Sequence, residues 1–459
     1  MNTTYRLINF WLFVCEYMKR IFFIIFDVAL IYGSILLTFY FLWMNERLDD
    51  FQRNFEAFII IYPFVGILYL ILMYAFGLYN ISRKTLPDVI YTVFLVSVSM
   101  MIGIMGICFF VRDVAWAFPR SVILISSLLI FFLLTLKDFV YWYISHRLRT
   151  VKKIIIIGND SEKLRHIIIN NYSKFYDVIG QYFEYDNTLP SKIEIIDEVF
   201  ICSDVQSKIR EKILPLCISY NKEVCIVPQY FDLSIISSSL YKIGDIPTFR
   251  ISNMGLTPEE RIVKRSIDML FGTVAFVLSL PIGLLLMGLI KLDGGPVFYA
   301  QERLTRENRI FKIFKFRTMI PDAEKMSGPV LAGDKDPRIT PLGRFMRILR
   351  LDEIPQLINI IIGDMSLVGP RPERPFFVEQ FEKEIPEYRF RLKVKAGLTG
   401  LAQVEGKYNT SVEDKLRYDL IYINNYSFLR DFIIMLQTIK ILFLKESTEG
   451  VNSNPPINE

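Results

Sequence analysis

Four long apolar runs open the chain and constrain its fold more than any other feature. They cover residues 21–43, 57–79, 90–112 and 121–144. Each run is long enough to cross a hydrocarbon core of about 30 Å as an α-helix. The mean hydropathy of the whole chain, +0.34, is too high for an ordinary soluble protein. Since no small-residue cleavage site follows the first run, we expect an anchor rather than a signal peptide, and residues 1–150 as a four-helix transmembrane bundle.

Basic residues around these runs predict the orientation of the bundle. They precede the first run, separate the second from the third and follow the fourth: Arg6, Lys19, Arg20, Arg83, Lys84, Arg147, Arg149, Lys152 and Lys153. Because basic flanks favour the cytoplasmic side, both ends of the bundle are expected in the cytoplasm. Asp27 and Lys137 lie within runs. We expect them to be satisfied polar residues rather than a transport path, since a path usually needs more ionisable residues.

Cysteine and histidine usage limits the chemistry that the chain can perform. The five cysteines form no Cys-x-x-Cys motif, so neither a zinc site nor a disulfide framework is indicated, and a reducing cytoplasm suits them. Both histidines, His146 and His166, lie in the first half. Chemistry in the second half must therefore use carboxylates, arginine or lysine. The net charge of +5 is modest, and we expect no nucleic-acid partner.

Residues 151–255 alternate between strand-like and helix-like patterns. The strand-like segments are 153–157, 177–184, 198–203 and 223–228, and the helix-like segments lie near 161–171 and 205–219. Such alternation is typical of a parallel sheet, so we expect a Rossmann-like domain. Gly158 follows the first strand, but the Gly-x-Gly-x-x-Gly motif is absent. A structural or regulatory module is therefore favoured over a working NAD site.

A fifth apolar run, residues 266–290, contains Pro281 near its middle. Proline breaks or kinks a helix, and Ser279 can satisfy backbone groups that the break leaves free. Basic residues flank the run on both sides, which places both of its ends in the cytoplasm. We therefore expect a re-entrant helical hairpin that dips into one leaflet and returns. An ordinary kinked span is the alternative.

Residues 340–375 gather the charged side chains best suited to catalysis. Asp352 and Glu353 are adjacent. Three arginines at helical spacing precede them: Arg344, Arg347 and Arg350. Pro355 fits a first helical turn, so Asp352 is expected at a helix N-terminus, where free N–H groups and nearby arginines favour its ionised form. Such a carboxylate could attack a phosphorus atom; an N-cap with surface ion pairs is the alternative.

Three further segments of the C-terminal half are amphipathic. Residues 311–319 interleave basic and aromatic residues, among them Lys315 and Arg317, and could form a strand near phosphates or an exposed basic face. Residues 342–350 indicate a basic helix at a membrane surface, with arginine available for phosphates. Residues 428–445 indicate a last helix that rests in the interface or packs on the domain.

Four segments together resemble the bacterial sugar transferase family, the monotopic phosphoglycosyl transferases that start capsule, exopolysaccharide and O-antigen synthesis. These segments are KRSIDMLFG, FKFRTM, LGRFMRILRLDEIPQLINIIIGDMSLVGPRP and KAGLTGLAQVEG. The resemblance implies a mostly helical catalytic domain at 256–446, followed by a flexible tail at 447–459. With the apolar runs and the α/β region, the chain looks like the long form of the family, the polyprenyl-phosphate hexose-1-phosphate transferases. The expected fold class is therefore membrane α plus α/β.

The resemblance also implies a two-step transfer at the bacterial cytoplasmic membrane. An aspartate attacks the β-phosphate of a UDP-sugar and releases UMP, and undecaprenyl phosphate then takes the phosphosugar from the enzyme. By position, Asp352 is the nucleophile and Glu353 is its partner, which helps to hold Mg²⁺. Arg347 and Arg371 match arginines associated with substrate phosphates.

Other features of the resemblance are less complete. Pro281 matches the helix-breaking proline of the re-entrant hairpin, but the family often has Ser-Pro where this chain has Ser279-Leu280-Pro281.

Glucose and galactose are the expected sugars, and N-acetylated or dideoxy sugars stay open. The bundle and the α/β domain could support a homo-oligomer or regulation. An NAD-linked oxidoreductase or sensor and a non-catalytic export scaffold are the competing hypotheses, and the scaffold leaves the carboxylate pair unexplained.

Overall fold

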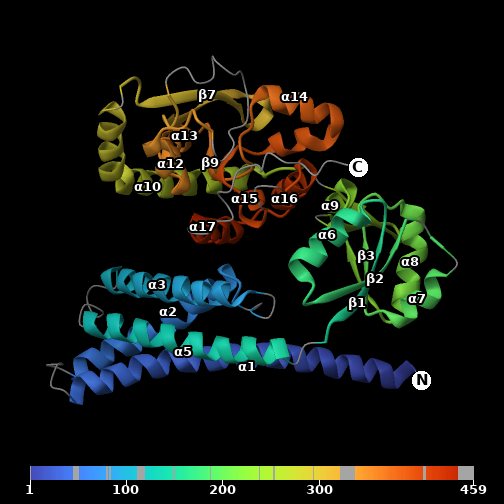
Figure 1. Ribbon diagram of the computed structural model, residues 1–459. Helices are drawn as coiled ribbons and strands as arrows, with labels where there is room; N and C mark the ends of the chain where they lie inside the picture. Colours follow the sequence, from blue (N-terminus) through green and yellow to red (C-terminus); the bar gives the residue numbers. More distant parts are fainter. Residues whose placement is uncertain are drawn as a thin grey trace. The chain divides into compact units, whose positions relative to one another are not determined.

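The computed structural model describes most of the chain, in two compact units, Met1–Arg149 and Thr150–Glu459 (Figure 1). The described residues are 2–44, 51–78, 81, 84–110, 119–147, 150–183, 185–186, 188–236, 238–251, 254–292, 294–320, 336–406 and 410–442. The predicted tail at 447–459 lies outside them. The predicted domains 151–255 and 256–446 both belong to the second unit.

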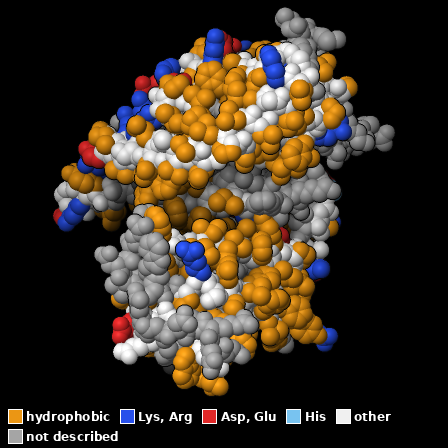
Figure 2. Space-filling model, turned by 90° about the vertical axis from the view of Figure 1, so that its left-hand side faces the viewer, with side chains coloured by type: hydrophobic (Ala, Val, Ile, Leu, Met, Phe, Trp, Pro, Cys, Tyr) orange, Lys and Arg blue, Asp and Glu red, His pale blue; other side chains and the backbone are white. Residues whose placement is uncertain are grey.

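Long apolar helices make up the first unit. They are α1 (Asn2–Met44), α2 (Phe51–Ala75), α3 (Leu86–Phe110) and α5 (Arg120–Arg147). Each is long and apolar enough to cross a membrane, as the sequence predicts. Large apolar side chains such as Phe22, Phe41 and Phe109 are exposed on their outer faces, and Figure 2 shows hydrophobic side chains gathered on the surface of the molecule. The helices therefore present the kind of surface that a hydrocarbon core requires.

Buried charged side chains join three of these helices. Tyr69 of α2 donates a 2.7 Å hydrogen bond to the carboxylate of Asp27 in α1. The ammonium of Lys137 in α5 pairs with the same carboxylate and lies 2.6 Å from that of Asp138. The prediction that Asp27 and Lys137 are satisfied polar residues is confirmed.

The second unit begins with a parallel four-stranded sheet in the order β2-β1-β3-β4. The strands are β1 (Lys152–Ile157), β2 (Tyr176–Tyr182), β3 (Glu198–Ile201) and β4 (Glu223–Ile226), and the helices are α6 (Ser161–Tyr172), α7 (Leu189–Ile195) and α8 (Ser207–Ser219). Figure 1 shows α6 on one side of the sheet and α7 and α8 on the other. Four consecutive isoleucines, 154–157, are buried in the core. The parallel α/β sheet is therefore as predicted, apart from the short helix α7.

Two small elements that the sequence analysis did not identify follow the sheet. One is the helix α9 (Tyr230–Ile236), and the other is an antiparallel hairpin of β5 (Ser239–Ile243) and β6 (Ile246–Arg250). Almost every residue of the hairpin is exposed, so it has no alternation of buried and exposed positions. Without that alternation, the period-two signal of a half-buried strand is missing.

Helix α10 (Pro258–Leu292) contains the fifth apolar run and is longer than the predicted 266–290. Pro281 lies inside it, and Figure 1 shows the helix bending into two arms. The hydroxyl of Ser279 donates a 2.8 Å hydrogen bond to the carbonyl of Phe276. This bond goes to a carbonyl one residue before the one that Pro281 leaves without its N–H donor, so the predicted role of Ser279 stays a prediction. The proline bends the helix and does not end it, since helical structure continues to Leu292.

The remaining elements form a compact mixed region. In chain order they are β7 (Phe298–Leu304), η2 (Arg306–Asn308), β8 (Ile310–Phe316), α12 (Pro341–Ile348), η3 (Leu351–Glu353), α13 (Gln356–Ile362), β9 (Ser366–Val368), α14 (Pro375–Glu384), η4 (Pro386–Lys393), β10 (Gly397–Thr399), α15 (Leu401–Glu405), α16 (Val412–Asn424) and α17 (Phe428–Leu442). Strands β7 and β8 are antiparallel, and β9 and β10 are parallel. Their core includes Ile360, Met365 and Leu416. This region carries the predicted catalytic residues.

Two contacts fix the first arm of α10 to this region. The ammonium of Lys264 lies 2.5 Å from the carboxylate of Asp431 in α17, and both side chains are buried. Arg265 donates to the carbonyls of Ile360 and Ile361 at the end of α13. Helix α17 therefore packs on the domain, which was one of its two predicted positions. Part of the basic flank used to predict membrane orientation also holds the domain together.

Candidate functional site

The adjacent carboxylates lie in a short 3₁₀ turn between two helices. Helix α12 ends at Ile348, and η3 holds Asp352 and Glu353. Helix α13 begins at Gln356 with Pro355 as its N-cap residue and ends at Ile362, followed by the C-cap Gly363, which has φ of +101°. The prediction that Asp352 begins a helix is therefore wrong, because a separate turn precedes α13.

Arg350, just before the turn, has a left-handed backbone with φ of +52°. Its carbonyl accepts the N–H of Glu353 at 3.1 Å, which closes the turn. This conformation is unfavourable for a residue with a side chain, and such outliers concentrate at functional sites. The left-handed residue lies between α12 and the turn that holds the carboxylate pair.

Two cations from distant segments converge on Glu353. The ammonium of Lys315, in β8, lies 2.9 Å from Oε1 of Glu353, and Arg371 donates to the same oxygen at 3.3 Å. Lys315 also lies 4.0 Å from the Oδ2 atom of Asp352. The structure thus brings together four predicted site residues: Asp352, Glu353, Lys315 and Arg371. Arg371 remains the most open of them, with 45% of its side chain exposed.

The two adjacent carboxyls differ in their electrostatic surroundings. Burial and the neighbouring Glu353 raise the pKa of Asp352 above its ordinary value, although Lys315, Arg347 and Arg371 oppose that rise. Burial also raises the pKa of Glu353, but Lys315, Arg371 and Arg350 outweigh it and hold that pKa well below its usual range. The expectation that the ionised form of Asp352 is favoured is therefore wrong in direction. The hydrogen bonds from Lys315 and Arg371 go to Glu353, whereas Lys315 approaches Asp352 only to 4.0 Å.

The other predicted arginines lie at different distances from the pair. Arg347 donates through Nε to the hydroxyl of Thr318 at 2.9 Å, and its charge acts on Asp352. Arg317 is buried, and its guanidinium donates to the carbonyl of Ile290 at the end of α10. The structure therefore does not bring Arg317 to the carboxylate pair. Pro281 and Ser279 lie at the bend of α10 and not beside the pair.

A proline-rich segment, residues 369–372, carries Arg371 beside the pair. The N–H of Gly369 bonds to the carbonyl of Thr399, and the N–H of Gly397 bonds to that of Pro370. A Cβ on Gly369 would lie 2.4 Å from the carbonyl oxygen of Lys395, so this close approach requires glycine. The segment is held against β10, which gives the guanidinium a rigid support.

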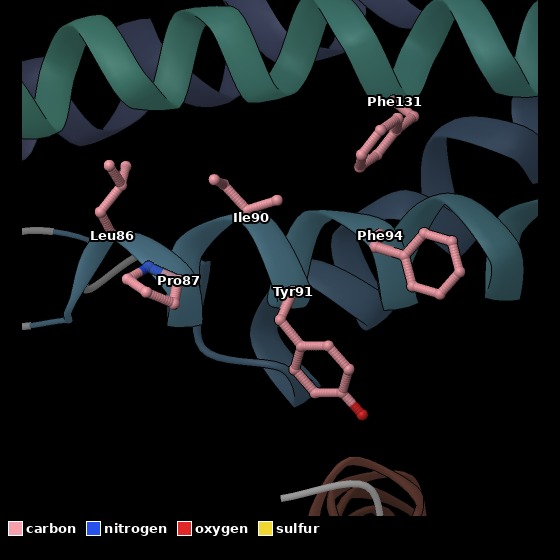
Figure 3. Close-up of a pocket in the computed structure, with 6 residues that line it drawn as sticks. All are labelled: Leu86, Pro87, Ile90, Tyr91, Phe94 and Phe131. Atoms are coloured by element: carbon pink, nitrogen blue, oxygen red, sulfur yellow. The ribbon is translucent and has the colours of Figure 1, made fainter.

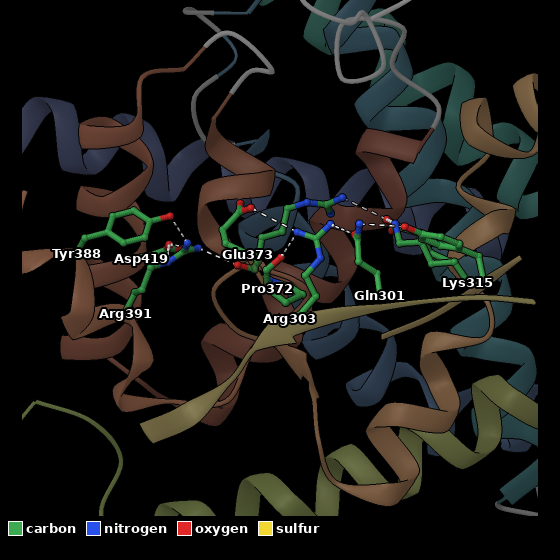
Figure 4. A network of polar contacts seen from close by, with 11 residues as sticks. Gln301, Arg303, Lys315, Pro372, Glu373, Tyr388, Arg391 and Asp419 are labelled. Atoms are coloured by element: carbon green, nitrogen blue, oxygen red, sulfur yellow. Dashed lines mark hydrogen bonds and ion pairs between the residues drawn. The ribbon is translucent and has the colours of Figure 1, made fainter. Parts of the chain in front are cut away.

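Beyond the predicted residues, a polar network extends from the pair through the domain (Figure 4). Its additional members are Gln301, Arg303, Glu373, Tyr388, Arg391 and Asp419. The sequence analysis missed them because no motif links the strand β7, the turn η4 and the helix α16. The buried ion pair of Arg391 and Asp419 joins residues 28 positions apart, and such a pairing has no local signal.

The donor set around the pair is compatible with one Mg²⁺ shared with a substrate. Among the described residues, no group of three or more acidic, histidine or cysteine side chains could hold a metal. Both cations contact Oε1 of Glu353, so Oε2 is the oxygen that would serve as a metal ligand. Mg²⁺ commonly takes one or two carboxylates and completes its shell with phosphate oxygens and water. The residues present therefore fit such an ion.

A shallow hollow in the first unit has a different character. It is lined by Leu86, Pro87, Ile90, Tyr91, Phe94 and Phe131 (Figure 3). These side chains come from α3 and α5 and include no cation. A diphosphate needs positive charge or several hydrogen-bond donors, so this hollow is not a candidate site for one.

The end of strand β1 bears on the dinucleotide hypothesis. Asp204 accepts the N–H of Asn159 at 2.5 Å, at the turn that leads into α6. A Cβ on Gly158 would lie 2.7 Å from Asp204 and 2.6 Å from Cys202, so the turn is already filled. In dinucleotide-binding folds the pyrophosphate occupies this position. A carboxylate there would repel it, which favours a structural or regulatory module.

Comparisons with known proteins agree with the motifs. The model of the family described as "Bacterial sugar transferase" matches residues 259–445. The UDP-N-acetylgalactosamine-undecaprenyl-phosphate N-acetylgalactosaminephosphotransferase of Aeromonas hydrophila is 40% identical over 205 residues, covering 44% of this chain and 48% of that protein. The undecaprenyl-phosphate galactose phosphotransferase of Salmonella typhimurium is 30% identical over 241 residues, covering 49% and 50% of the two chains.

A shorter relative is matched over most of its length. The exopolysaccharide production protein ExoY of Sinorhizobium fredii is 36% identical over 208 residues, which cover 42% of this chain and 91% of that protein. In contrast, the match spans about half of the length of the two longer relatives. Residues 259–445, which carry the carboxylate pair and its cations, identify this chain as a member of the bacterial sugar transferase family.

Proposed function

We propose that the chain transfers a hexose-1-phosphate from a UDP-sugar to undecaprenyl phosphate and releases UMP, the first membrane step of exopolysaccharide, capsule or O-antigen synthesis. One observation carries the proposal. Asp352 adjoins a glutamate on which Lys315 and Arg371 converge. Relatives named for transfer of galactose, glucose or N-acetylgalactosamine to undecaprenyl phosphate support the same reaction class.

In the first step, an oxygen of Asp352 forms a bond to the β-phosphorus of the UDP-sugar. The bond from that phosphorus to the bridging oxygen breaks, and UMP leaves with the oxygen. Lys315 and Arg371 bind the phosphate oxygens, so their charge offsets the charge of the attacking carboxylate. Burial of Asp352 keeps water away from the nucleophile and makes its carboxylate more basic.

In the second step, an oxygen of undecaprenyl phosphate attacks the same phosphorus. The aspartyl–phosphorus bond breaks and the Asp352 carboxylate is restored, so the charge balance of the site returns to its initial state. Glu353 is the residue that would hold Mg²⁺ through Oε2. When bound, that ion would neutralise charge on the substrate diphosphate.

The exposed apolar residues around the bend of α10 support a membrane arrangement for this site. Around the bend, Leu278, Leu284 and Leu285 are each at least 64% exposed, and hydrophobic side chains cover much of that face (Figure 2). The bend at Pro281 supports a re-entrant path in one leaflet of the cytoplasmic membrane, with the carboxylate pair on the cytoplasmic side. There the site meets both a soluble nucleotide and a lipid phosphate. A cysteine placed beyond each end of α10 and probed with an impermeant maleimide tests this path: both should react from the cytoplasmic side only.

The activity is tested with membranes that contain the full chain, undecaprenyl phosphate and a panel of radiolabelled UDP-sugars. We expect label in the lipid extract and release of UMP with UDP-glucose or UDP-galactose. UDP-N-acetylgalactosamine belongs in the panel because a relative is named for it. Absence of lipid-linked label with every UDP-sugar would contradict the proposal. Oxidation or reduction of added nicotinamide cofactor by the same membranes would favour the oxidoreductase hypothesis instead.

A further inference from the structure

The backbone around Arg371 is held through the carbonyls of three successive residues, each of which accepts a hydrogen bond. The carbonyl of Pro370 accepts the N–H of Gly397 at 2.9 Å, that of Arg371 accepts Nη2 of Arg391 at 2.9 Å, and that of Pro372 accepts Nη1 of Arg303 at 3.2 Å. Residues 370 and 372 are prolines and have no N–H to donate, and their φ is fixed. The segment therefore has little freedom, and two of its three restraints are guanidinium groups.

Arg391 is itself held by buried partners. Its side chain lies in η4, and the residue is 6% exposed, while Asp419 of α16 is 2% exposed. Oδ2 of Asp419 lies 3.1 Å from Nε and 2.9 Å from Nη2 of Arg391, and Nη1 donates to the hydroxyl of Tyr388 (Figure 4). Because Nη2 contacts both Asp419 and the Arg371 carbonyl, one nitrogen connects α16 to the segment.

We propose that Arg391, fixed by Asp419, is a positioning residue that sets the backbone of Arg371, and thereby the guanidinium at Glu353, before a substrate phosphate binds. This inference rests on the proposed function. Arg391 does not contact the carboxylate pair, so it acts only through Arg371. An ion pair kept from water needs a specific geometry to offset its desolvation, and here that geometry fixes the position of a third group.

Arg303 holds the opposite end of the segment less tightly. Its guanidinium donates a 2.6 Å hydrogen bond to Oε1 of Gln301 and lies 3.6 Å from the carboxylate of Glu373. Its bond to Pro372 is the longest of the three backbone restraints. The tighter restraint is on Arg371 itself, which makes Asp419 and Arg391 the sharper targets for an experiment.

The test is a double-mutant cycle between Asp419→Asn and Arg371→Ala in the full-length protein. If Asp419 acts through Arg371, Asp419→Asn should lower kcat/KM for the UDP-sugar by about 10- to 100-fold in the wild-type background. In the Arg371→Ala background it should cause less than about a threefold further loss. A purely structural role would give losses that multiply in the double variant, and that result would overturn the proposal.

A matched control separates positioning from general destabilisation. Asp232 of α9 lies 2.9 Å from Arg210 of α8, which in turn donates to the carbonyls of Cys202 and Ser203. Asp232→Asn breaks a similar arrangement that makes no contact with the backbone of Arg371, so its effect on kcat/KM should be the same with and without Arg371. If Asp419→Asn does not fold, Arg391→Lys, which keeps the charge and loses the fork, completes the same cycle.

The outcomes for the two proposals are distinguishable. If the wild-type protein transfers no sugar phosphate from any UDP-sugar, the proposed function fails. If the wild-type protein is active and the two losses multiply, only the positioning role fails.

Discussion

Two clusters of carboxylates and cations in this protein use the same residue types for different ends. In the first unit, Lys137 pairs with both Asp27 and Asp138, and the three side chains are 11%, 6% and 2% exposed. In the second unit, the side chain of Glu353 is also only 11% exposed, but that of its partner Arg371 is 45% exposed. The first cluster is closed on itself, and the second is open at its cationic side.

The charge balance of the two clusters also differs. Two carboxylates share Lys137 in the first, with Tyr69 as a neutral donor and Lys84 as a further cation whose charge acts on Asp138. In the second, the charges of Lys315, Arg347, Arg350 and Arg371 all act on the Asp352–Glu353 pair. An open cluster with excess positive charge attracts an anion, whereas a closed one holds helices together. The candidate site therefore differs from the closed cluster in its excess of positive charge and in the exposure of Arg371, and not in the types of ionisable residue that it contains.

The largest expected effect is at Asp352. Asp352→Asn removes the proposed nucleophile, so turnover should fall by more than about 10³-fold. No labelled sugar-phosphate adduct should form on the protein, as measured after denaturation and gel separation. Asp364→Asn is the control, because Asp364 lies in the same domain and pairs with Arg309. An adduct that persists in Asp352→Asn would remove this residue from its role.

Removal of the cation from the closed cluster should act on stability instead. Lys137→Met leaves two buried carboxylates without their partner, which should lower the free energy of unfolding of the first unit by about 3–5 kcal/mol. The measurement is thermal unfolding in detergent. The folded fraction should retain the kcat of the wild-type protein. A loss of kcat without a loss of stability would mean that the closed cluster takes part in the reaction.

The contrast between the clusters also shows what sequence can reveal. The apolar runs and the parallel strands were predictable because their signals are local and periodic. The carboxylate pair was predictable because motif residues surround it. The sequence did not predict which of the two carboxyls binds the cations, because Lys315 and Arg371 lie 38 and 18 residues from Glu353 along the chain. The exposed hairpin β5–β6 was missed because it buries neither face.

A smaller effect should follow from the loss of one cation at the open cluster. Lys315 lowers the pKa of Asp352, so Lys315→Met should raise that pKa further. Because the reaction needs ionised Asp352, the rate falls as pH drops through this pKa, and the acidic limb of the kcat/KM profile should move to higher pH. Lys383→Met, at an exposed position in α14, should leave the limb in place. An unchanged limb in Lys315→Met would mean that Lys315 does not stabilise the ionised nucleophile.

The smallest expected effect is at Arg350, where the contribution of its charge to substrate binding can be measured separately from the effect of its backbone on stability. This residue has φ of +52°, so Arg350→Gly relieves a strained backbone and should raise the free energy of unfolding by at most about 1 kcal/mol. The same change removes one cation that lowers the pKa of Glu353, so KM for the UDP-sugar should rise by about threefold. Asn221→Gly is the control, because Asn221 has φ of +55° in the α/β domain. It should bring a smaller gain in stability, because Asn tolerates the left-handed conformation better than Arg, with no change in KM. A variant at residue 350 that gains stability and keeps its KM would show that the excess charge of the open cluster does not extend to this arginine.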